Sequence, residues 1–294
     1  MSVINASHTD MVIELPHLKL VARAWGPHHG YPILALHGWL DNSASFEPLV
    51  ADESWLHDHN WRLIALDLAG HGHSQHRPKG CHPVFLDYVD DLHQVIQTLK
   101  LEKPWLLGHS MGGGIATVYA GTGVTELAGV ILIEALGPLS SLADDAPKQL
   151  AKHLSARHRH TTQQKRAYQD IAAVIKLRAE QSGLPEDIVN LIIQRNMMKT
   201  EQGYQWRSDP RLRVPSAVYM THEQIEAFVA NIACPTMIIS AEDGLMPNYP
   251  VLGERAELLK LKTMVAMSGG HHLHMTNPEP VRNKIIEYIT KTTR

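Results

Sequence analysis

One serine in this chain stands where a nucleophile of covalent catalysis is expected. Residues 104–114 read PWLLGHSMGGG, in which a short apolar run precedes a glycine-flanked turn at Ser110 and a helical pattern follows it. A serine on such a turn projects its hydroxyl out of the sheet, since the glycines remove Cβ atoms that would collide there. The same turn places the backbone N–H of Met111 at a helix N-terminus, where developing negative charge is stabilised. The segment therefore predicts a nucleophile together with one oxyanion donor.

Partners for the serine follow it along the chain. The pattern around Ser110, G-x-S-x-G, has only three fixed positions and can occur by chance. Its interpretation therefore depends on a base that takes the serine proton and a carboxylate that orients that base. The segment IISAEDG, residues 238–244, places two carboxylates at the end of an apolar run. The segment SGGHHLH, residues 268–274, places three histidines after the next apolar run. Nucleophile, acid and histidine candidates thus each follow a predicted strand.

The elements that must position these groups alternate between strands and helices in the first half of the chain. Continuous apolar runs predict strands buried on both faces, and residues 85–99 have the spacing of an amphipathic helix. Two strands of alternating polarity precede them and predict an antiparallel edge. Such alternation is typical of a mostly parallel sheet flanked by helices. The predicted strands are 11–15, 18–25, 32–36, 61–66, 105–107 and 130–133.

The alternation stops after residue 136. Residues 137–230 hold several amphipathic helical stretches and a polar, arginine-rich segment at 201–216, with no run that resembles a buried strand. We therefore expect an α/β core formed by residues 1–136 and 231–294, with an inserted, mainly helical cap or lid at 137–230. The predicted helices of this half are 146–153, 164–181, 185–198, 222–232, 251–261 and 280–290, and its predicted strands are 236–240 and 263–267.

Composition limits the classes of partner. The chain has 294 residues, 44% of them hydrophobic and 19% charged, and its formal net charge of −3 favours neither nucleic acid nor an anionic membrane. Cys81 and Cys234 lie far apart without metal or redox spacing and are expected to be free thiols. The first residues lack the pattern of an export signal, and no apolar run approaches about 18 residues. We expect a cytoplasmic protein without membrane insertion, as a monomer or small homo-oligomer.

Histidine is abundant, with 20 copies, and several stand in pairs. Pairs in loops lack the helical i, i+4 spacing and the accompanying carboxylate that indicate a zinc enzyme. We therefore expect no catalytic metal, and nothing in the sequence implies a cofactor.

Five segments in a fixed order carry a family resemblance. The chain contains HGWLDNSASF, DLAGHGHS, GHSMGGG, IISAEDGL and GGHHLHMTNPEPV, and with them it resembles an α/β-hydrolase-fold serine hydrolase over nearly its whole length. The segments HGWLDN and WRSDPRL are similar to the subgroup called serine hydrolase-like proteins. The resemblance implies the α/β-hydrolase fold, with a serine nucleophile, an acid and a histidine in that chain order.

The resemblance also implies which histidine is the base. The family's Gly-His pair at the last strand end matches Gly270 and His271, so His271 is expected to take the proton of Ser110. The adjacent His272 stays an alternative base, because either ring could reach the serine if the loop shifted. His274 is expected to pack or to hydrogen-bond locally, and His109 to belong to the turn.

Three carboxylates compete for the role of the acid. The family has a carboxylate a few residues past a glycine at the preceding strand end, but Ala241 stands where that glycine would be and the spacing is one residue short. Asp243 is the preferred acid, and Glu242 is an alternative. Glu134, at the end of the strand before the insertion, is a further alternative because some family members place the acid there.

The remaining parts of the site come from two loops. The backbone N–H of Trp39, which follows a His-Gly pair, is expected to be the second oxyanion donor beside that of Met111. The D-x-x-G-x-G-x-S loop that starts at Asp67 is interpreted as a tight turn held by a hydrogen-bonding aspartate, without chemistry of its own.

The residue type at the nucleophile position, here Ser110, also indicates which reactions of the fold family are compatible with this chain. Haloalkane dehalogenases and epoxide hydrolases of this fold use Asp as nucleophile, and dienelactone hydrolases use Cys, so Ser110 argues against all three. We expect hydrolysis of small-molecule carboxylic esters of short to medium acyl chain through an acyl-serine. The alternatives are carbon–carbon bond, thioester or lactone hydrolysis on the same fold, or a non-catalytic ligand-binding role.

Overall fold

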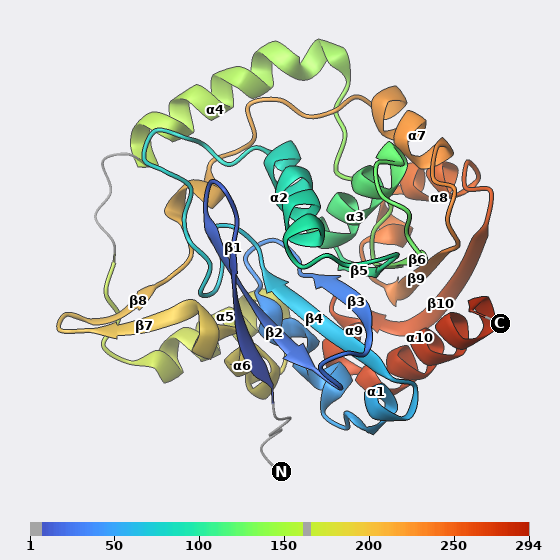
Figure 1. Ribbon diagram of the computed structural model, residues 1–294. Helices are drawn as coiled ribbons and strands as arrows, with labels where there is room; N and C mark the ends of the chain where they lie inside the picture. Colours follow the sequence, from blue (N-terminus) through green and yellow to red (C-terminus); the bar gives the residue numbers. More distant parts are fainter. Residues whose placement is uncertain (1–7, 161–165, 294) are drawn as a thin grey trace.

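The computed structural model describes residues 8–160 and 166–293. An eight-stranded sheet runs through the molecule and helices cover both of its faces (Figure 1). The α/β class and the mostly parallel sheet expected from the sequence are confirmed. The strands of this sheet are β1 (Thr9–Glu14), β2 (Lys19–Trp25), β3 (Tyr31–Leu36), β4 (Trp61–Asp67), β5 (Trp105–His109), β6 (Gly129–Ile133), β9 (Thr236–Asp243) and β10 (Lys262–Gly270).

The order of the strands brings distant segments to one edge of the sheet. The order is β1-β2-β4-β3-β5-β6-β9-β10, with β1 and β2 as the antiparallel edge and parallel pairing from β4 to β10. The carboxyl ends of parallel strands meet at the same edge, where sites in α/β proteins are built. Ser110, Glu134 and His271 each directly follow one of these strand ends.

Two hydrophobic cores lie on the two faces of the sheet. Along β3, Leu34 and Leu36 pack into the core on one face, whereas Ile33 and Ala35 pack into the core on the other, as side chains alternate along a strand. This double burial is why the inner strands read as continuous apolar runs. The helices of the first face are α2 (Phe85–Thr98), α3 (Met111–Thr122), α7 (His222–Ala230) and α8 (Pro250–Ala256), and those of the second are α1 (Ser54–Asp58), α9 (Leu273–Thr276) and α10 (Pro278–Thr292), with the 3-10 helix η1 (Ser43–Val50).

The insertion, residues 137–230, is mainly helical but also contains a small hairpin. The predicted helix at 185–198 ends at Asn196, and β7 (Met197–Thr200) pairs with β8 (Gly203–Trp206). The turn of the hairpin needs Gly203, whose φ is +115°. The polar segment expected at 201–216 thus contains a strand. The remaining elements of the insertion before α7 are η2 (Ala143–Asp145), α4 (Ala146–His160), α5 (Ile171–Ser182), α6 (Glu186–Asn196) and η3 (Pro210–Arg213).

The start of α5 differs from the helix predicted at 164–181. Residues 164 and 165 lie outside the described residues, and the helix begins at Ile171. The side chain of Asp170 accepts a hydrogen bond from the N–H of Ala172 at 2.8 Å and so caps the helix. Upstream of this cap, Tyr168 exchanges backbone hydrogen bonds with Tyr204 of the hairpin, which excludes helix there.

The last helix of the insertion packs in the core of the sheet domain. Ile225 and Val229 of α7 are buried in the same core as α3. The side-chain amide of Asn231 donates to the Gly121 carbonyl at 2.7 Å, and a Cβ on Gly121 would lie 2.4 Å from the Phe228 carbonyl oxygen. The division into a core of 1–136 and 231–294 and a cap of 137–230 stays a prediction, and α7 is the part of the insertion that belongs to the core packing.

A buried ion pair joins the insertion to the sheet. Asp67 lies at the end of β4 and is fully buried, and the Nε of Arg195 in α6 donates to both of its carboxylate oxygens at 3.0 and 2.9 Å. The N–H groups of Ser43 and His73 also donate to this carboxylate. Burial alone would raise the pKa of Asp67, but Arg195 and these N–H donors outweigh it and the pKa is lowered. The turn predicted around Asp67 therefore also binds the insertion.

Further polar contacts hold the insertion against the loop after β3. The side-chain amide of Asn42 donates to the Ile192 carbonyl at 2.9 Å, and that of Asn196 donates to the Leu40 carbonyl at 3.1 Å. The indole N–H of Trp39 donates to the Leu212 carbonyl at 3.1 Å. The loop that carries Trp39 is therefore fixed from the side of the insertion as well as from the sheet.

Two expectations from composition can be compared with the structure. Cys81 and Cys234 are both free. Within residues 8–160 and 166–293, no helix combines the length and the apolar character needed to cross a membrane.

Removal of one partner of the buried pair should destabilise the protein strongly. Arg195→Ala leaves the buried Asp67 carboxylate uncompensated, which costs about 3–5 kcal/mol of unfolding free energy. Because the pKa of Asp67 is lowered in the folded state, its stabilising contribution is present near neutral pH and is lost as acid protonates the carboxylate. Urea unfolding followed by circular dichroism at pH 7 measures the loss.

The exposed Lys199, also in the insertion, provides the matched control. Lys199→Ala should stay within about 0.5 kcal/mol of the parent protein. Similar unfolding midpoints for both variants would contradict the importance given to the Asp67–Arg195 pair.

Candidate active site

Ser110 occupies a strained turn between β5 and α3. Its φ of +50° and ψ of −117° lie outside the regions that side-chain-bearing residues ordinarily adopt. The backbone N–H of Ser110 donates to the Ile133 carbonyl at 3.0 Å, and its own carbonyl accepts from the N–H of Gly114 at 3.0 Å. The strained residue is thus held by β6 on one side and by the first turn of α3 on the other.

The glycines around Ser110 permit a close approach to β3. A Cβ on Gly112 would lie 2.1 Å from the Leu36 carbonyl oxygen, and the N–H of Gly112 donates to the His37 carbonyl at 3.1 Å. A Cβ on Gly108 would lie 2.5 Å from the Cα of Gly113. The start of α3 can therefore pack directly on the end of β3 only because these positions carry no side chain.

The carboxylate of Glu134 connects the ends of three strands. Glu134 directly follows β6, is fully buried and has a φ of +56°. Its Oε1 accepts the N–H of Ala241 in β9 at 2.6 Å, and its Oε2 accepts the N–H of Leu245 just beyond. The same Oε2 lies 3.3 Å from Nδ1 of His271, directly after β10.

The surroundings of Glu134 keep it ionised. Burial alone would raise the pKa of this carboxyl, but the hydrogen bonds from His271 and from the N–H groups of Ala241 and Leu245 outweigh burial and lower the pKa. A Cβ on Gly244 would lie 2.2 Å from Oε2, so the loop can wrap the carboxylate only with glycine at this position. The site therefore presents an anionic acceptor to one nitrogen of His271.

The structure does not bring the side chain of Asp243, the preferred acid, or that of Glu242 to His271, and Glu134 lies there instead. Both side chains are exposed at the end of β9. Glu242 accepts a hydrogen bond from the Ser268 hydroxyl at 3.0 Å, and Asp243 has no side-chain hydrogen bond or ion pair within the described part of the chain. The inward position of this strand end is occupied by the buried Ala241, so β9 contributes a backbone N–H to the site instead of a carboxylate.

His271 is fixed beside the serine turn. Its backbone carbonyl accepts the Nε2–H of His109 at 2.9 Å, and the two rings lie 4.8 Å apart between centroids. His109 directly precedes Ser110, so this contact ties the histidine loop to the nucleophile turn. No hydrogen bond joins the Ser110 hydroxyl to a His271 nitrogen among the described residues. Catalytic hydrogen bonds of this kind often form only when substrate is bound.

The two backbone N–H groups expected to bind an oxyanion are those of Trp39 and Met111. Among the described residues, neither the N–H of Trp39 nor that of Met111 has a hydrogen-bond partner. The N–H of Met111 is the first of α3, where the helix favours negative charge. Together the two groups have the chemistry of an oxyanion hole.

His37 sets the shape of the Trp39 loop, a role that the sequence reasoning missed. Its Nε2 accepts the N–H of Leu68 at 3.0 Å, so its Nδ1 carries the hydrogen and donates to the Gly38 carbonyl at 2.7 Å. The N–H of Asp41 donates to the same carbonyl at 3.1 Å. Burial lowers the pKa of His37, which keeps this tautomer uncharged. The His-Gly pair before Trp39 was visible in the sequence, but the partners of the ring were not.

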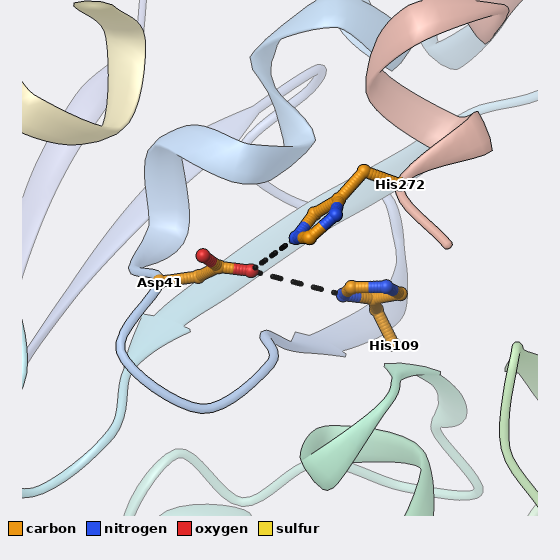
Figure 2. A group of neighbouring side chains, drawn as sticks. All are labelled: Asp41, His109 and His272. Carbon is orange, nitrogen blue, oxygen red and sulfur yellow. Dashed lines mark hydrogen bonds and ion pairs between the residues drawn. The ribbon is translucent and has the colours of Figure 1, made fainter. Parts of the chain in front are cut away.

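The alternative base, His272, is directed towards a different carboxylate. Its Nε2 lies 3.3 Å from Oδ2 of Asp41, and Nδ1 of His109 lies 3.9 Å from the same oxygen (Figure 2). Burial alone would raise the pKa of Asp41, but its hydrogen bond with His272 and the nearby charge of Arg178 help to lower it. This geometry favours His271 over His272 as the base.

His274 and His109 complete a group of four neighbouring histidines. The two rings lie 4.2 Å apart, and His274 also packs against Phe46. Burial lowers the pKa of His274 to about 3 and that of His109 well below its ordinary value. These two rings are therefore neutral at physiological pH, and His274 packs locally as expected.

The chain belongs to the α/β hydrolase fold family, whose family model matches residues 31–278. It is 28% identical to a serine hydrolase-like protein of Danio rerio over 291 residues, which cover 96% of this chain and 88% of the relative. It is 26% identical to serine hydrolase-like protein 2 of Homo sapiens over 304 residues, with 97% of this chain and 95% of the relative covered. The resemblance to serine hydrolase-like proteins is thereby confirmed.

A solved structure supports the same assignment. The crystal structure of the selenomethionine-substituted hypothetical protein PA1622 from Pseudomonas aeruginosa PAO1 superposes with a TM-score of 0.88 and 33% sequence identity, covering 96% of this chain and 99% of that one. The agreement therefore extends over the insertion as well as the sheet.

A methyl group at position 112 should disrupt the serine turn. Gly112→Ala places a Cβ 2.1 Å from a backbone oxygen, so α3 must move away from β3. Overpacking of this kind costs about 1–3 kcal/mol of unfolding free energy. The midpoint of thermal unfolding should fall accordingly.

Gly253 in α8 is the control, since a Cβ there meets nothing within 4 Å. Gly253→Ala should raise the unfolding free energy by up to about 1 kcal/mol through helix propensity. A Gly112→Ala protein as stable as Gly253→Ala would contradict the close approach described for the turn.

Proposed function

We propose that this protein is a serine carboxylesterase that cleaves esters of short to medium acyl chain. Ser110 is the nucleophile, His271 the base and Glu134 the acid, and the N–H groups of Trp39 and Met111 bind the oxyanion. The observation that carries the proposal is the position of His271, held between the Glu134 carboxylate and the turn that bears Ser110.

The proposed reaction passes through an acyl-enzyme. His271 takes the hydroxyl proton of Ser110 while the oxygen attacks the ester carbonyl carbon, and the negative oxygen that develops is bound by the two N–H groups. His271 then gives its proton to the departing alkoxide. Water enters, loses a proton to His271 and releases the acid by the same steps. Glu134 stays ionised throughout and stabilises the imidazolium through Nδ1.

Glu134 as the acid is supported by its electrostatic setting. A carboxylate that accepts two backbone N–H groups and is buried beside the imidazole is held in one orientation. It can therefore fix the tautomer of His271 with hydrogen on Nδ1, which leaves Nε2 free to act as base. An exposed carboxylate such as Asp243 would be screened by water and has no comparable constraint.

The restricted acyl length is supported by how the insertion is attached. The loop that carries Trp39, a proposed oxyanion donor, is bound by the insertion at Trp39, Leu40 and Asn42. The insertion is therefore fixed beside this loop, and in this proposal it forms one boundary of the acyl-binding region. Such a boundary suits small esters better than long acyl chains.

The first experiment is a panel of p-nitrophenyl esters from acetate to laurate. The parent protein should hydrolyse the shorter members, and Ser110→Ala should lose about 10³-fold or more in kcat because only the oxyanion hole and binding remain. Circular dichroism of the variant checks that it is folded. Equal turnover by parent and variant would exclude the acyl-serine route, and no ester turnover at all would favour carbon–carbon, thioester or lactone substrates.

A second experiment separates the two candidate acids. Glu134→Gln retains the shape of the side chain but removes the charge that fixes the His271 tautomer, so kcat should fall by about 10³- to 10⁴-fold. The matched change at the exposed position, Asp243→Asn, should leave kcat within about twofold of that of the parent protein. The reverse pattern would return the role of the acid to Asp243.

A further inference from the structure

Three side chains of metal-ligand type converge beside the serine turn from distant parts of the chain. Asp41 comes from the loop after β3, His109 from the end of β5, and His272 from the loop after β10 (Figure 2). Oδ2 of Asp41, Nδ1 of His109 and Nε2 of His272 all lie within 4.8 Å of one another. Asp41 and His109 are buried, and only 19% of the His272 side chain is exposed.

The arrangement leaves an electron pair on His109 without a partner. Nε2 of His109 must carry its hydrogen, since it contacts the His271 carbonyl oxygen, which can only accept. In the neutral ring Nδ1 then bears a lone pair, and this fully buried atom has no hydrogen-bond partner. It faces the Asp41 carboxylate at 3.9 Å. Two electron-rich atoms directed at each other are stabilised by a cation between them.

A glycine borders the space between these two groups. A Cβ on Gly38 would lie 3.0 Å from Nδ1 of His109 and 3.1 Å from Oδ2 of Asp41. Any larger residue at position 38 would therefore crowd both atoms. Of the three side chains, that of His272 is the one partly exposed to solvent.

We propose that Asp41, His109 and His272 form a binding site for a divalent transition-metal ion of the zinc class. Two imidazole nitrogens and one carboxylate oxygen suit zinc or cobalt, whereas calcium and magnesium prefer oxygen ligands throughout. Bonds of about 2.0–2.1 Å in a tetrahedral site place neighbouring donors roughly 3.3 Å apart. The His272–Asp41 separation is already 3.3 Å, and the His109–Asp41 separation of 3.9 Å must shorten. Water completes the coordination.

This ion is separate from the proposed esterase chemistry. Neither His271 nor Glu134 is among its ligands, and the ion acts on the site by tying two backbone segments together. His109 directly precedes Ser110 and His272 directly follows His271, so the ion fixes the spacing of nucleophile and base. The expectation of no catalytic metal rested on spacing along the sequence, which cannot detect ligands from three separate segments.

Cobalt binding tests the site without reference to ester turnover. Full-length protein without a histidine tag is stripped with a chelator and titrated with Co²⁺, followed by visible absorption and calorimetry, and Zn²⁺ is then added as competitor. One tight equivalent with a tetrahedral Co²⁺ spectrum that Zn²⁺ abolishes is expected. Asp41→Asn and His272→Gln should each weaken this binding by about 100-fold or more, since even outer groups contribute 10- to 100-fold.

Controls distinguish this site from surface histidines and from misfolding. His28 and His29 form an exposed pair with ring centroids 4.8 Å apart, and the double change to Gln should leave the tight equivalent intact. Zinc should raise the unfolding midpoint of the parent and of this double variant but not of Asp41→Asn. Asp41→Asn is isosteric, and circular dichroism checks its fold. Absence of the cobalt spectrum, or equal affinity in the parent and Asp41→Asn, would overturn the assignment.

Discussion

The buried carboxylate of Glu134 is the contact on which the arrangement of the site depends. A buried charge is tolerated only when hydrogen bonds and an opposite charge compensate for lost hydration. Here the compensation comes from the N–H groups of Ala241 and Leu245 and from His271. Satisfying one carboxylate therefore fixes the end of β9, the loop that follows it and the loop after β10 relative to β6. This arrangement requires a positive φ at Glu134 and a residue without a side chain at position 244.

A second set of buried polar groups gives the insertion a defined position. Asp67, Asn42 and Asn196 lie in or against the two loops at the carboxyl ends of β3 and β4, and each forms contacts across the boundary. Buried polar groups that are all satisfied specify one arrangement, because displacement would leave several of them unpaired. The loop that carries Trp39 is thus shaped by the contact of His37 with Leu68 and by the contact of Trp39 with Leu212 of the insertion.

The sequence was sufficient to predict features that depend on local chemistry. The turn at Ser110 follows from glycines next to the serine, and the strands follow from apolar runs that two-sided burial requires. The carboxylate beside His271 was harder to predict, because Asp243 ends β9 and Glu134 directly follows β6, and the choice between them depends on side-chain direction. Ala241 takes the inward position of β9, and a positive φ turns Glu134 inward, which no spacing rule reveals. The group of Asp41, His109 and His272 was hidden because its members are distant in sequence. The hairpin at 197–206 was missed because its short strands lack the long apolar runs of the main sheet.

The ion pair between Asp67 and Arg195 also constrains how the insertion can move. A hinged opening of α6 would separate the pair and expose a carboxylate that the fold has already desolvated, so such opening is rare and slow. Helix α6 therefore stays against the carboxyl ends of β3 and β4 in the folded protein. Helix α4 is attached differently, since Gln149 and His153 contact the carbonyls of Ser216 and Pro215 within the insertion itself. The insertion thus cannot swing away from the sheet as one rigid body without exposing a desolvated charge.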